Sequence, residues 1–513
     1  MGLDGAGHRP AHRGGGRPAA GRPSPLSMTA NKPPLPTGPI LVAGLARAGH
    51  AALGRLVGLR PPGTLHAWDA NDSQAMQARA TRWRRRGVSV CLGGDGRSLL
   101  GSNPPFGAIV KSPGIALDAP LFQAALTQGV PVIDELEVGW RLCSAPITAV
   151  TGTNGKSTTC ALIAAITRAA GHPVQRVGNT EFGPPLSAAQ PGPAVVCEVS
   201  SFQLEAAPSF LPAVAVFTNL SMDHLDRHGG MEAYGRVKQR MFVADGRTCG
   251  CAVVNADDPW GRRILQAVQQ AGGRSLSYGF SPSADLRLVE ARWTMREAHV
   301  RLAYDGRVID LPSRLPGRHN ALNIAAAVGA AVASGVGWDD IAAGVAGAEA
   351  PPGRCRLIDD GQPFDVVVDY AHTPDGIAQF LDAMRVVVDA RGGALRTVFG
   401  AVGLPDPVKA RDCAQAARRL SDHVIFTTGS APRSSRVLRL RELRDAGREI
   451  GPVELVLDRR RAIQRALVSA RPGDVVAILG LGALRYQTLN DKGAYAAFND
   501  ADAAASLLRE SPL

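Results

Sequence analysis

Short apolar runs that end in glycine or in polar residues recur along the chain, separated by helix-like stretches. Runs of four to six apolar residues are typical of buried strands in a parallel sheet. Their alternation with helices predicts an α/β protein that binds its ligands at the carboxyl ends of the strands. The runs are residues 40–43, 108–111, 147–150, 194–197, 214–217, 250–255, 366–369, 397–400 and 475–480.

The chain has 513 residues, which is too long for a single hydrophobic core. Residues 1–36 are rich in Gly, Pro, Arg and Ala and lack periodicity, so we expect a disordered tail. Met28 lies inside that tail, and we expect it to be the natural start. Residues 37–143 and 351–513 are each predicted to form a Rossmann-like domain. Residues 144–350 are predicted to form a central domain with a mostly parallel sheet.

Composition excludes several classes of protein. The net charge is +12, but the first 32 residues hold five basic residues against one acidic residue, and the remaining excess is spread thinly. No basic stripe with interleaved aromatic residues is visible, so nucleic acid is not an expected partner. No apolar run is long enough to insert into a membrane, and no signal peptide is visible. The eight cysteines form no C-x-x-C pair, which favours reduced thiols in a cytoplasmic enzyme.

The most specific chemical signal is the stretch 147–159, which reads ITAVTGTNGKSTT. A strand, a glycine turn and a helix that begins at Lys156 form a cradle in which backbone N–H groups and the helix dipole attract phosphate. Lys156 adds a positive charge, and the Ser157 hydroxyl can bind magnesium. Val150 stands where the usual pattern has its first glycine. The flanking strand and helix nevertheless predict a nucleoside triphosphate site.

Polar residues follow the next two strands of the same segment. Glu198 ends one strand, where its carboxylate could reach a magnesium ion at the phosphate loop. Asp223 and His224 follow the other strand in a polar loop, and this cluster favours a functional role over a structural one. Lys238 lies on a following helix and, by itself, is interpreted as an exposed helix lysine.

The first folded segment carries a weaker signal. Gly44 opens a turn after the first strand that is similar to a Rossmann turn, with Ala46 in place of the middle glycine. Asp69 ends the next strand, where a ribose-binding acid is expected. Ser112, Pro113 and Gly114 form a turn after a further strand. Ordinary turn chemistry explains these three residues as well as ligand binding does.

Taken together, these motifs resemble the Mur ligases, which are ATP-dependent amide-forming enzymes of peptidoglycan precursor synthesis. The resemblance rests on TGTNGKST, Ser-Ser-Phe-Gln-Leu-Glu, Asn…Asp-His-x-Asp-Arg-His and Tyr-x-x-x-Lys in one order, and it covers nearly everything from residue 39 onward. It implies a UDP-sugar-binding domain at 37–143, a central P-loop ATPase domain that binds ATP at 144–350 and an amino-acid-binding domain at 351–513. It also implies that the enzyme uses ATP and Mg²⁺ and that its other substrates are UDP-N-acetylmuramoyl-L-alanine and an amino acid. It further implies that the enzyme is a monomer.

The resemblance assigns roles to individual residues. It makes Lys156, Lys238, His224 and Glu198 catalytic. It places Ser157, Glu198, His224 and Lys238 at the metal, with Lys238 carbamylated to give an extra carboxylate. The implied ATP contacts are Gly152, Thr153, Asn154, Gly155, Lys156, Ser157, Thr158, Asn323, Arg354 and Asp369. The implied substrate contacts are Gly44, Arg47, Asp69, Ser112, Pro113, Gly114, Asn179, Ser201, Gln203, His372, Lys409 and Arg433.

Within the family, the first two domains resemble the D-glutamate-adding members most. The stretch from Asp369 to Asp375 looks more like the members that add a diamino acid. The two motifs by which those members recognise a diamino acid, Asp-Asn-Pro-Arg and Lys-Gly-His-Glu, read Ser-Ala-Pro-Arg at 430–433 and Leu-Gly-Ala-Leu at 481–484. The carboxylate for a distal ammonium is therefore missing, so we expect glutamate of D configuration rather than diaminopimelate or lysine.

Three alternatives stay open. A Mur-type ligase could add L-glutamate or another amino acid, or act outside the main cell-wall pathway. A nucleotide-binding protein without activity is disfavoured by the retained Lys156, Glu198, His224 and Lys238. A Rossmann oxidoreductase would rest only on the turn at Gly44 and would leave the phosphate loop unexplained.

Overall fold

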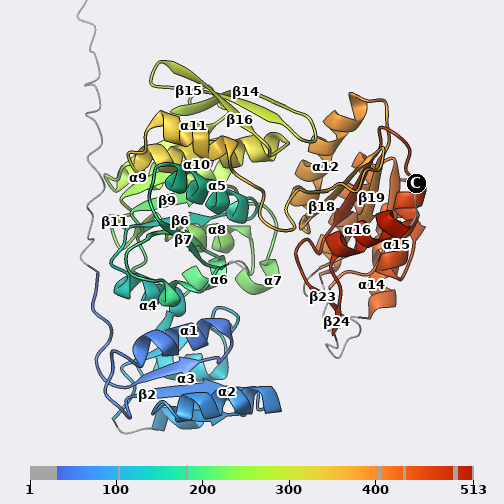
Figure 1. The fold of residues 1–513 in the computed structure, drawn as a ribbon. Coiled ribbons are helices and arrows are strands. Elements are labelled where there is room, and N and C mark those ends of the chain that lie inside the picture. Colours follow the sequence, from blue (N-terminus) through green and yellow to red (C-terminus); the bar gives the residue numbers. More distant parts are fainter. Residues whose placement is uncertain are drawn as a thin grey trace, which may run out of the picture.

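Three sheets built of mainly parallel strands form the framework of the molecule, each made by a consecutive segment of the chain (Figure 1). The computed structural model describes residues 32–101, 104–179, 183–402, 406–430, 435–488 and 495–510. The predicted α/β class with three domains is confirmed. No helix in the described part of the chain is long and apolar enough to cross a membrane. The predicted start at Met28 lies outside the described residues.

The first sheet has the strand order β3-β2-β1-β4-β5, and all its strands are parallel. The order reverses between β1 and β4, and the turn at Gly44 follows β1 at this point. The elements are β1 (Ile40–Ala43), α1 (Arg47–Leu56), β2 (Leu65–Asp69), α2 (Gln74–Arg84), β3 (Ser89–Leu92), β4 (Ala108–Lys111), α3 (Pro120–Thr127), β5 (Val132–Asp134) and α4 (Glu135–Leu142), with a 3₁₀ turn η1 at Arg97–Gly101.

The central sheet has nine strands in the order β16-β15-β14-β13-β12-β9-β6-β8-β7. Its neighbouring strands are parallel except that β15 pairs antiparallel with both β14 and β16. Its strands are β6 (Ile147–Thr151), β7 (Val174–Gly178), β8 (Ala194–Glu198), β9 (Val214–Phe217), β12 (Cys251–Asn255), β13 (Ser275–Gly279), β14 (Leu286–Trp293), β15 (Ala298–Tyr304) and β16 (Arg307–Ser313). Its helices are α5 (Lys156–Ala169), α6 (Ser201–Leu204), α7 (Leu225–His228), α8 (Met231–Gln239), α9 (Pro259–Gln270), α10 (Arg318–Ala333) and α11 (Trp338–Ala346). A 3₁₀ turn η2 (Leu186–Ala188) and a small hairpin, β10 (Val243–Ala244) with β11 (Arg247–Thr248), complete the domain.

Alternate residues of the central strands pack into two separate hydrophobic cores. Ala149 of β6 packs into one core and its neighbour Val150 into the other, because successive side chains of a strand point to opposite faces. Helices α5, α10 and α11 pack together over the Val150 face (Figure 1). Helix α5 is therefore fixed along its length, which holds the phosphate loop at its N-terminus in place.

The third sheet has the order β17-β18-β22-β19-β20-β21, and β17 alone is antiparallel to its neighbour. Its elements are β17 (Arg356–Ile358), β18 (Asp365–Asp369), α12 (Pro374–Asp389), β19 (Leu395–Phe399), α13 (Pro407–Leu420), β20 (His423–Phe426), α14 (Arg436–Arg448), β21 (Glu454–Leu455), α15 (Arg459–Val468), β22 (Val475–Leu479) and α16 (Asp500–Glu510), with a hairpin of β23 (Tyr486–Thr488) and β24 (Tyr495–Ala497).

Residues 32–36, which fall in the tail that we predict to be disordered, contact the folded chain. The Lys32 ammonium donates to the carbonyl oxygens of Trp140 and Cys143 at 2.8 and 2.5 Å. The Arg141 guanidinium donates to the Pro34 carbonyl at 2.9 Å. The last residues of the tail therefore pack beside the end of α4.

Candidate active site

The phosphate loop joins β6 to α5 at the point where the central sheet changes its strand order, because β6 lies between β8 and β9. Gly152 and Gly155 have φ angles of 149° and 84°. A Cβ atom on them would lie 1.9 Å from Thr218 Oγ1 and 2.2 Å from Asn323 Oδ1, so only glycine fits. The first-turn N–H groups of α5 have no acceptor within the helix and can bind an anion.

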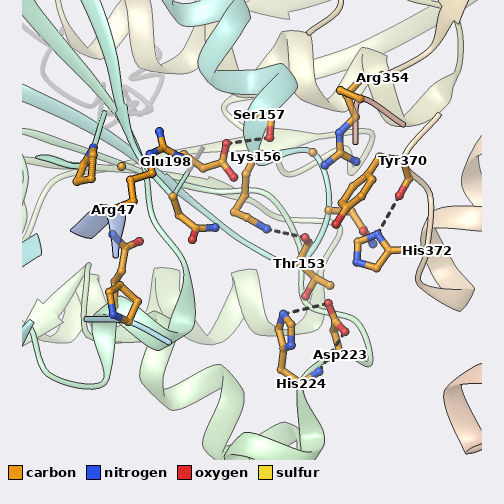
Figure 2. A pocket seen from close by; sticks show the side chains of 18 of the residues that line it. Arg47, Thr153, Lys156, Ser157, Glu198, Asp223, His224, Arg354, Tyr370 and His372 are labelled. Carbon is orange, nitrogen blue, oxygen red and sulfur yellow. Dashed lines mark hydrogen bonds and ion pairs between the residues drawn. The ribbon is translucent and has the colours of Figure 1, made fainter. Parts of the chain in front are cut away.

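Lys156 and Ser157 open helix α5 and face a cavity of about 410 Å³ (Figure 2). The Lys156 ammonium donates to the carbonyl oxygens of Gly152 and Thr153, at 3.1 and 2.7 Å. The Ser157 hydroxyl donates to Glu198 Oε2 at 2.8 Å. Burial raises the pKa of the Glu198 carboxyl, and Lys156 opposes that rise. Glu198 therefore lies beside the phosphate loop, and its predicted contact with a magnesium ion there stays a prediction.

This arrangement fits a magnesium ion that arrives with a nucleotide. Among the described residues, no three His, Cys, Asp or Glu side chains are grouped to hold a metal by themselves. Magnesium, however, usually keeps several waters and binds proteins through one or two carboxylates together with substrate phosphates. Glu198 and the Ser157 hydroxyl supply such hard oxygen donors directly beside the loop.

His224 begins the short helix α7 with a left-handed backbone, at φ 54° and ψ 30°. Its Nε2 lies 3.3 Å from Asp223 Oδ2, and its ring packs 4.7 Å from the ring of Phe202. Burial lowers the pKa of His224 to about 4, although Asp223 opposes this shift. The imidazole is therefore uncharged at neutral pH, the form in which histidine can bind a metal.

Lys238, interpreted from the sequence alone as an exposed helix lysine, is in fact buried, with 1% of its surface exposed. Its ammonium donates to the Gly152 carbonyl at 2.8 Å and lies 4.6 Å from the centre of the Tyr234 ring. Burial lowers the pKa of Lys238 well below its ordinary value, and Lys156 lowers it further. The interpretation of Lys238 as an exposed lysine was wrong, because helical spacing alone does not reveal which face of α8 packs against the phosphate loop.

The turn at Gly44 after β1 and the turn at Ser112 after β4 lie in close contact. A Cβ atom on Gly44, which has a φ angle of 91°, would lie 2.6 Å from Ser112 Oγ, and this hydroxyl donates to the Gly44 carbonyl at 3.3 Å. Asp69 Oδ2 accepts from the Leu45 N–H at 2.7 Å. In this structure Ser112 and Asp69 hold the turn that leads to Arg47, and Arg47 lines the cavity.

A second cavity of about 250 Å³ lies on the other side of the phosphate loop, between α10 and α12. Asn323 contributes to its wall, and its Oδ1 accepts from the Thr159 hydroxyl at 3.3 Å. His319, from the preceding turn of α10, has a buried Nδ1 without a partner among the described residues. The size and the amide-rich wall suit a purine base.

The third domain contributes residues to the walls of both cavities. Arg354 lines both and lies 4.6 Å from the centre of the Tyr370 ring. Asp369 accepts from the N–H groups of Cys355 and Ala371, each at 2.7 Å, so its carboxylate orders the chain around Arg354. Burial lowers the pKa of His372 to about 4, and Lys409 contributes to the shift.

Two polar contacts join the third domain to the central domain. The Asn154 amide donates to Asp375 Oδ2 at 3.0 Å, and its oxygen accepts from the Thr373 hydroxyl at 3.2 Å. The Lys409 ammonium forms an ion pair with Asp223 at 2.7 Å. Asn154 belongs to the phosphate loop, so the loop itself contacts the N-terminus of α12.

The structure brings many of the predicted residues together. Those that line the larger cavity are Arg47, Pro113, Thr153, Asn154, Gly155, Lys156, Ser157, Asn179, Glu198, Gln203, His224, Arg354 and His372. Asn323 and Asp369 line the second cavity. Predicted residues outside both linings are Gly44, Asp69, Ser112, Gly114, Gly152, Thr158, Ser201, Lys238 and Lys409. Arg433 lies outside the described residues.

Sequence reasoning assigned no role to several residues of the cavity walls. Glu135, Pro185, Tyr370 and Ala483 line the larger cavity, and Asp257, Tyr278, Gln379 and Phe380 line the second. Glu135 and Pro185 meet only because α4 of the first domain packs against η2 of the central domain. A contact between two domains leaves no signal in hydrophobic periodicity.

Comparisons with known proteins agree on one family. Residues 150–331 match the Mur ligase middle domain, and residues 353–482 match the Mur ligase, glutamate ligase domain. The UDP-N-acetylmuramoyl-L-alanyl-D-glutamate–2,6-diaminopimelate ligase of Solibacter usitatus is 36% identical over 372 residues, which cover 67% of this chain and 74% of that protein.

Solved structures show the same architecture. A solved structure of a UDP-N-acetylmuramoyl-L-alanyl-D-glutamate–2,6-diaminopimelate ligase superposes with a TM-score of 0.52 at 26% identity, over 78% of this chain and 92% of that one. The UDP-N-acetylmuramate-alanine ligase MurC from Thermotoga maritima superposes with a TM-score of 0.58 at 19% identity, over 92% of this chain and 99% of that one. The second likeness concerns the fold alone.

The prediction that the chain is nearest to the D-glutamate-adding members is wrong, because the relatives are named as diaminopimelate ligases. The predicted likeness of the third domain to the diamino-acid branch is partly right. The prediction of a D-glutamate-adding member rested on the stretches 112–115 and 200–203, which therefore do not separate the D-glutamate-adding members from the diaminopimelate-adding ones. The identity and coverage of these matches show that the chain belongs to the Mur ligase family and is an ATP-dependent ligase.

Proposed function

We propose that this protein joins glutamate to the carboxylate of UDP-N-acetylmuramoyl-L-alanine, in the cytoplasm, at the expense of ATP. One observation carries the choice of amino acid. The third-domain residues on the wall of the larger cavity include one cationic side chain, Arg354, one neutral imidazole and no acidic side chain: Pro352, Arg354, Tyr370, His372 and Ala483. Such a wall suits a side-chain carboxylate better than a distal ammonium, which needs a counter-charge when it is buried.

The nucleotide is assigned to the phosphate loop and the second cavity. The first-turn N–H groups of α5 and the Lys156 ammonium bind the β- and γ-phosphates, as in other phosphate loops. Asn323 and His319 lie at the base-sized cavity. Arg354 reaches both cavities, so it approaches the phosphates from the third domain.

Glu198 and Ser157, with His224 and a carbamylated Lys238, would hold magnesium. The metal would supply positive charge that offsets the repulsion between ATP and an anionic acceptor. The acceptor lies in the half of the cavity bounded by Arg47, Asn179 and Gln203. Its carboxylate attacks the γ-phosphate, ADP leaves, and the resulting acyl phosphate is attacked by the amino group of glutamate with loss of phosphate.

Closure of the third domain excludes water from the acyl phosphate. The contacts of Asn154 with Asp375 and Thr373, and of Lys409 with Asp223, lie on the two surfaces that meet on closure. A loop that binds phosphate and also holds the third domain can couple nucleotide binding to closure.

A second candidate is the addition of a diamino acid to UDP-N-acetylmuramoyl-L-alanyl-D-glutamate, as the names of the relatives indicate. The two candidates differ in both substrates, so one set of assays separates them. The sequence at 481–484 and the cavity wall both favour glutamate.

We expect phosphate release with UDP-N-acetylmuramoyl-L-alanine to be faster with D- or L-glutamate than with diaminopimelate or lysine. The measurement is kcat/KM for each amino acid with each of the two acceptors, with ATP alone as the background control. We expect a preference of at least about tenfold for glutamate, because a buried unpaired ammonium costs more than one hydrogen bond. A higher kcat/KM for either diamino acid with either acceptor would overturn the assignment.

A further inference from the structure

Glu135 is a buried carboxyl group at the junction of the first and central domains, and the mechanism above gives it no role. It begins α4 directly after Asp134, whose Oδ1 caps the helix by accepting from the Leu136 N–H at 3.0 Å. Glu135 is 1% exposed, and its Oε1 accepts from the Ser187 N–H of η2 at 2.6 Å. The carboxyl group is thus held by one oxygen.

The second carboxyl oxygen of Glu135, Oε2, differs from Oε1 in its contacts. Glu135 Oε2 is buried and has no hydrogen bond of good geometry among the described residues. The Ser187 hydroxyl lies close enough to the carboxyl group to lower its pKa, but it too lacks a well-formed hydrogen bond. Leaving a buried carboxyl oxygen unpaired is costly, so native proteins rarely do it without a reason. Glu135 lines the larger cavity together with Arg47, Asn179 and Gln203, the half that we assign to the acceptor.

Glu137 shows that burial on this helix does not by itself leave an oxygen unpaired. It lies two residues further along α4 and is fully buried. Its Oε1 accepts from the Arg141 guanidinium at 2.8 Å, and its Oε2 accepts from the Ser209 N–H at 3.2 Å. Glu137 is not among the residues of the cavity wall, so the two carboxyl groups differ in whether they face the cavity.

The charged groups around Glu135 decide which form it takes. Burial raises the pKa of Glu135 to about 7, and Asp134 adds to the rise. The hydroxyl and the N–H of Ser187 oppose it, and Arg47 of α1 opposes it to a smaller extent. Asp134 is itself paired with Lys111 at 3.1 Å. Near neutral pH much of the carboxyl is protonated and can donate a hydrogen bond, which suits an acceptor that carries a diphosphate and a carboxylate.

We propose that Glu135 determines acceptor binding by donating a hydrogen bond from its second oxygen to an oxygen atom of the UDP-sugar acceptor. This inference rests on the proposed function. The role is one of substrate recognition, so it affects the KM for the acceptor much more than kcat or the KM for ATP.

The test compares Glu135→Ala, Glu135→Gln and Glu137→Gln with the wild type. We expect Glu135→Ala to raise the KM for UDP-N-acetylmuramoyl-L-alanine about tenfold, the value of one hydrogen bond to a buried group. In the wild type, that KM should rise above about pH 7, because ionisation removes the donated proton and repels the anionic acceptor. The glutamine side chain keeps a hydrogen-bond donor and stays neutral, so the KM of Glu135→Gln for the acceptor should not rise above pH 7.

Glu137→Gln is the matched control, and we expect it to keep the wild-type KM and the wild-type pH profile even if its thermal stability falls. Calorimetric titration of the acceptor against the same proteins measures binding apart from turnover. The inference is overturned if Glu135→Gln keeps the wild-type pH profile or if Glu135→Ala binds the acceptor within twofold of the wild type. If the wild type neither binds nor turns over this acceptor, the proposed function itself fails, which is a separate result.

Discussion

Lys156→Ala is expected to lower ATP-dependent phosphate release by about 10²–10³-fold while the protein stays folded. The ammonium faces the cavity from the first turn of α5 and lies beside the cradle for the transferred phosphate. Removing one preorganised charge or donor from such a site costs this much in rate. The change is made in a half-buried loop, where the lost bonds to the Gly152 and Thr153 carbonyls are replaced by water. Stability should therefore change by only about 1 kcal/mol.

Arg168→Ala is the matched control for this experiment, because it removes an exposed cation from the last turn of the same helix. We expect this variant to keep near-normal phosphate release. Thermal unfolding of both variants without nucleotide separates loss of activity from loss of fold. Near-normal phosphate release by a folded Lys156→Ala protein would contradict the assignment of the ATP site.

The phosphate site was predictable because its determinants are local. A strand, a turn with two glycines and a helix that begins with Lys-Ser occupy thirteen consecutive residues, and the structure forms these elements at β6 and α5. The contact between Ser157 and Glu198 spans 41 residues. It was still predictable, because the carboxyl ends of parallel strands meet at one edge of a sheet.

Contacts between domains were not predictable from the pattern. The bond between Asn154 and Asp375 spans 221 residues, and the pair of Lys409 with Asp223 spans 186. Asp69 was predicted as a ribose-binding acid from its position at the end of β2, and in the structure one of its oxygens accepts a hydrogen bond from the Leu45 N–H. Position along a strand indicates where a side chain lies, but not which neighbour takes its hydrogen bonds.

We expect Lys238 to be carbamylated in the active enzyme, and we expect loss of the carbamate to lower activity strongly. The neutral amine would attack carbon dioxide, form an N–C bond and release a proton, which turns the side chain into a carboxylate. The lowered pKa of Lys238 keeps the amine neutral at lower pH than in a free lysine, so the reaction can occur near neutral pH. The carbamate nitrogen keeps one N–H, which can still donate to the Gly152 carbonyl.

The structure makes an unmodified ammonium a poor fit for this position. Lys238 is buried beside the phosphate loop, close enough to Lys156 for the two cations to repel each other. Two buried cations would attract phosphate, but they would also repel the magnesium that Glu198 and Ser157 are placed to bind. A carbamate supplies an anionic oxygen, the donor that magnesium prefers.

We therefore expect activity to fall after carbon dioxide is stripped at mildly acidic pH, which protonates the amine and releases the carbamate, and to return when bicarbonate is added. Lys238→Ala should lose about 10²–10³-fold in phosphate release, as for other groups that stabilise the transferred phosphate, and still bind ATP. Arg236→Ala, on the same helix but largely exposed and paired with Glu232, should keep its activity and its response to bicarbonate. ¹³C-labelled bicarbonate should give a carbamate signal in the wild type and none in Lys238→Ala. An unmodified Lys238 ammonium in a high-resolution map of the magnesium–ATP complex, from a preparation shown to be active, would refute the modification.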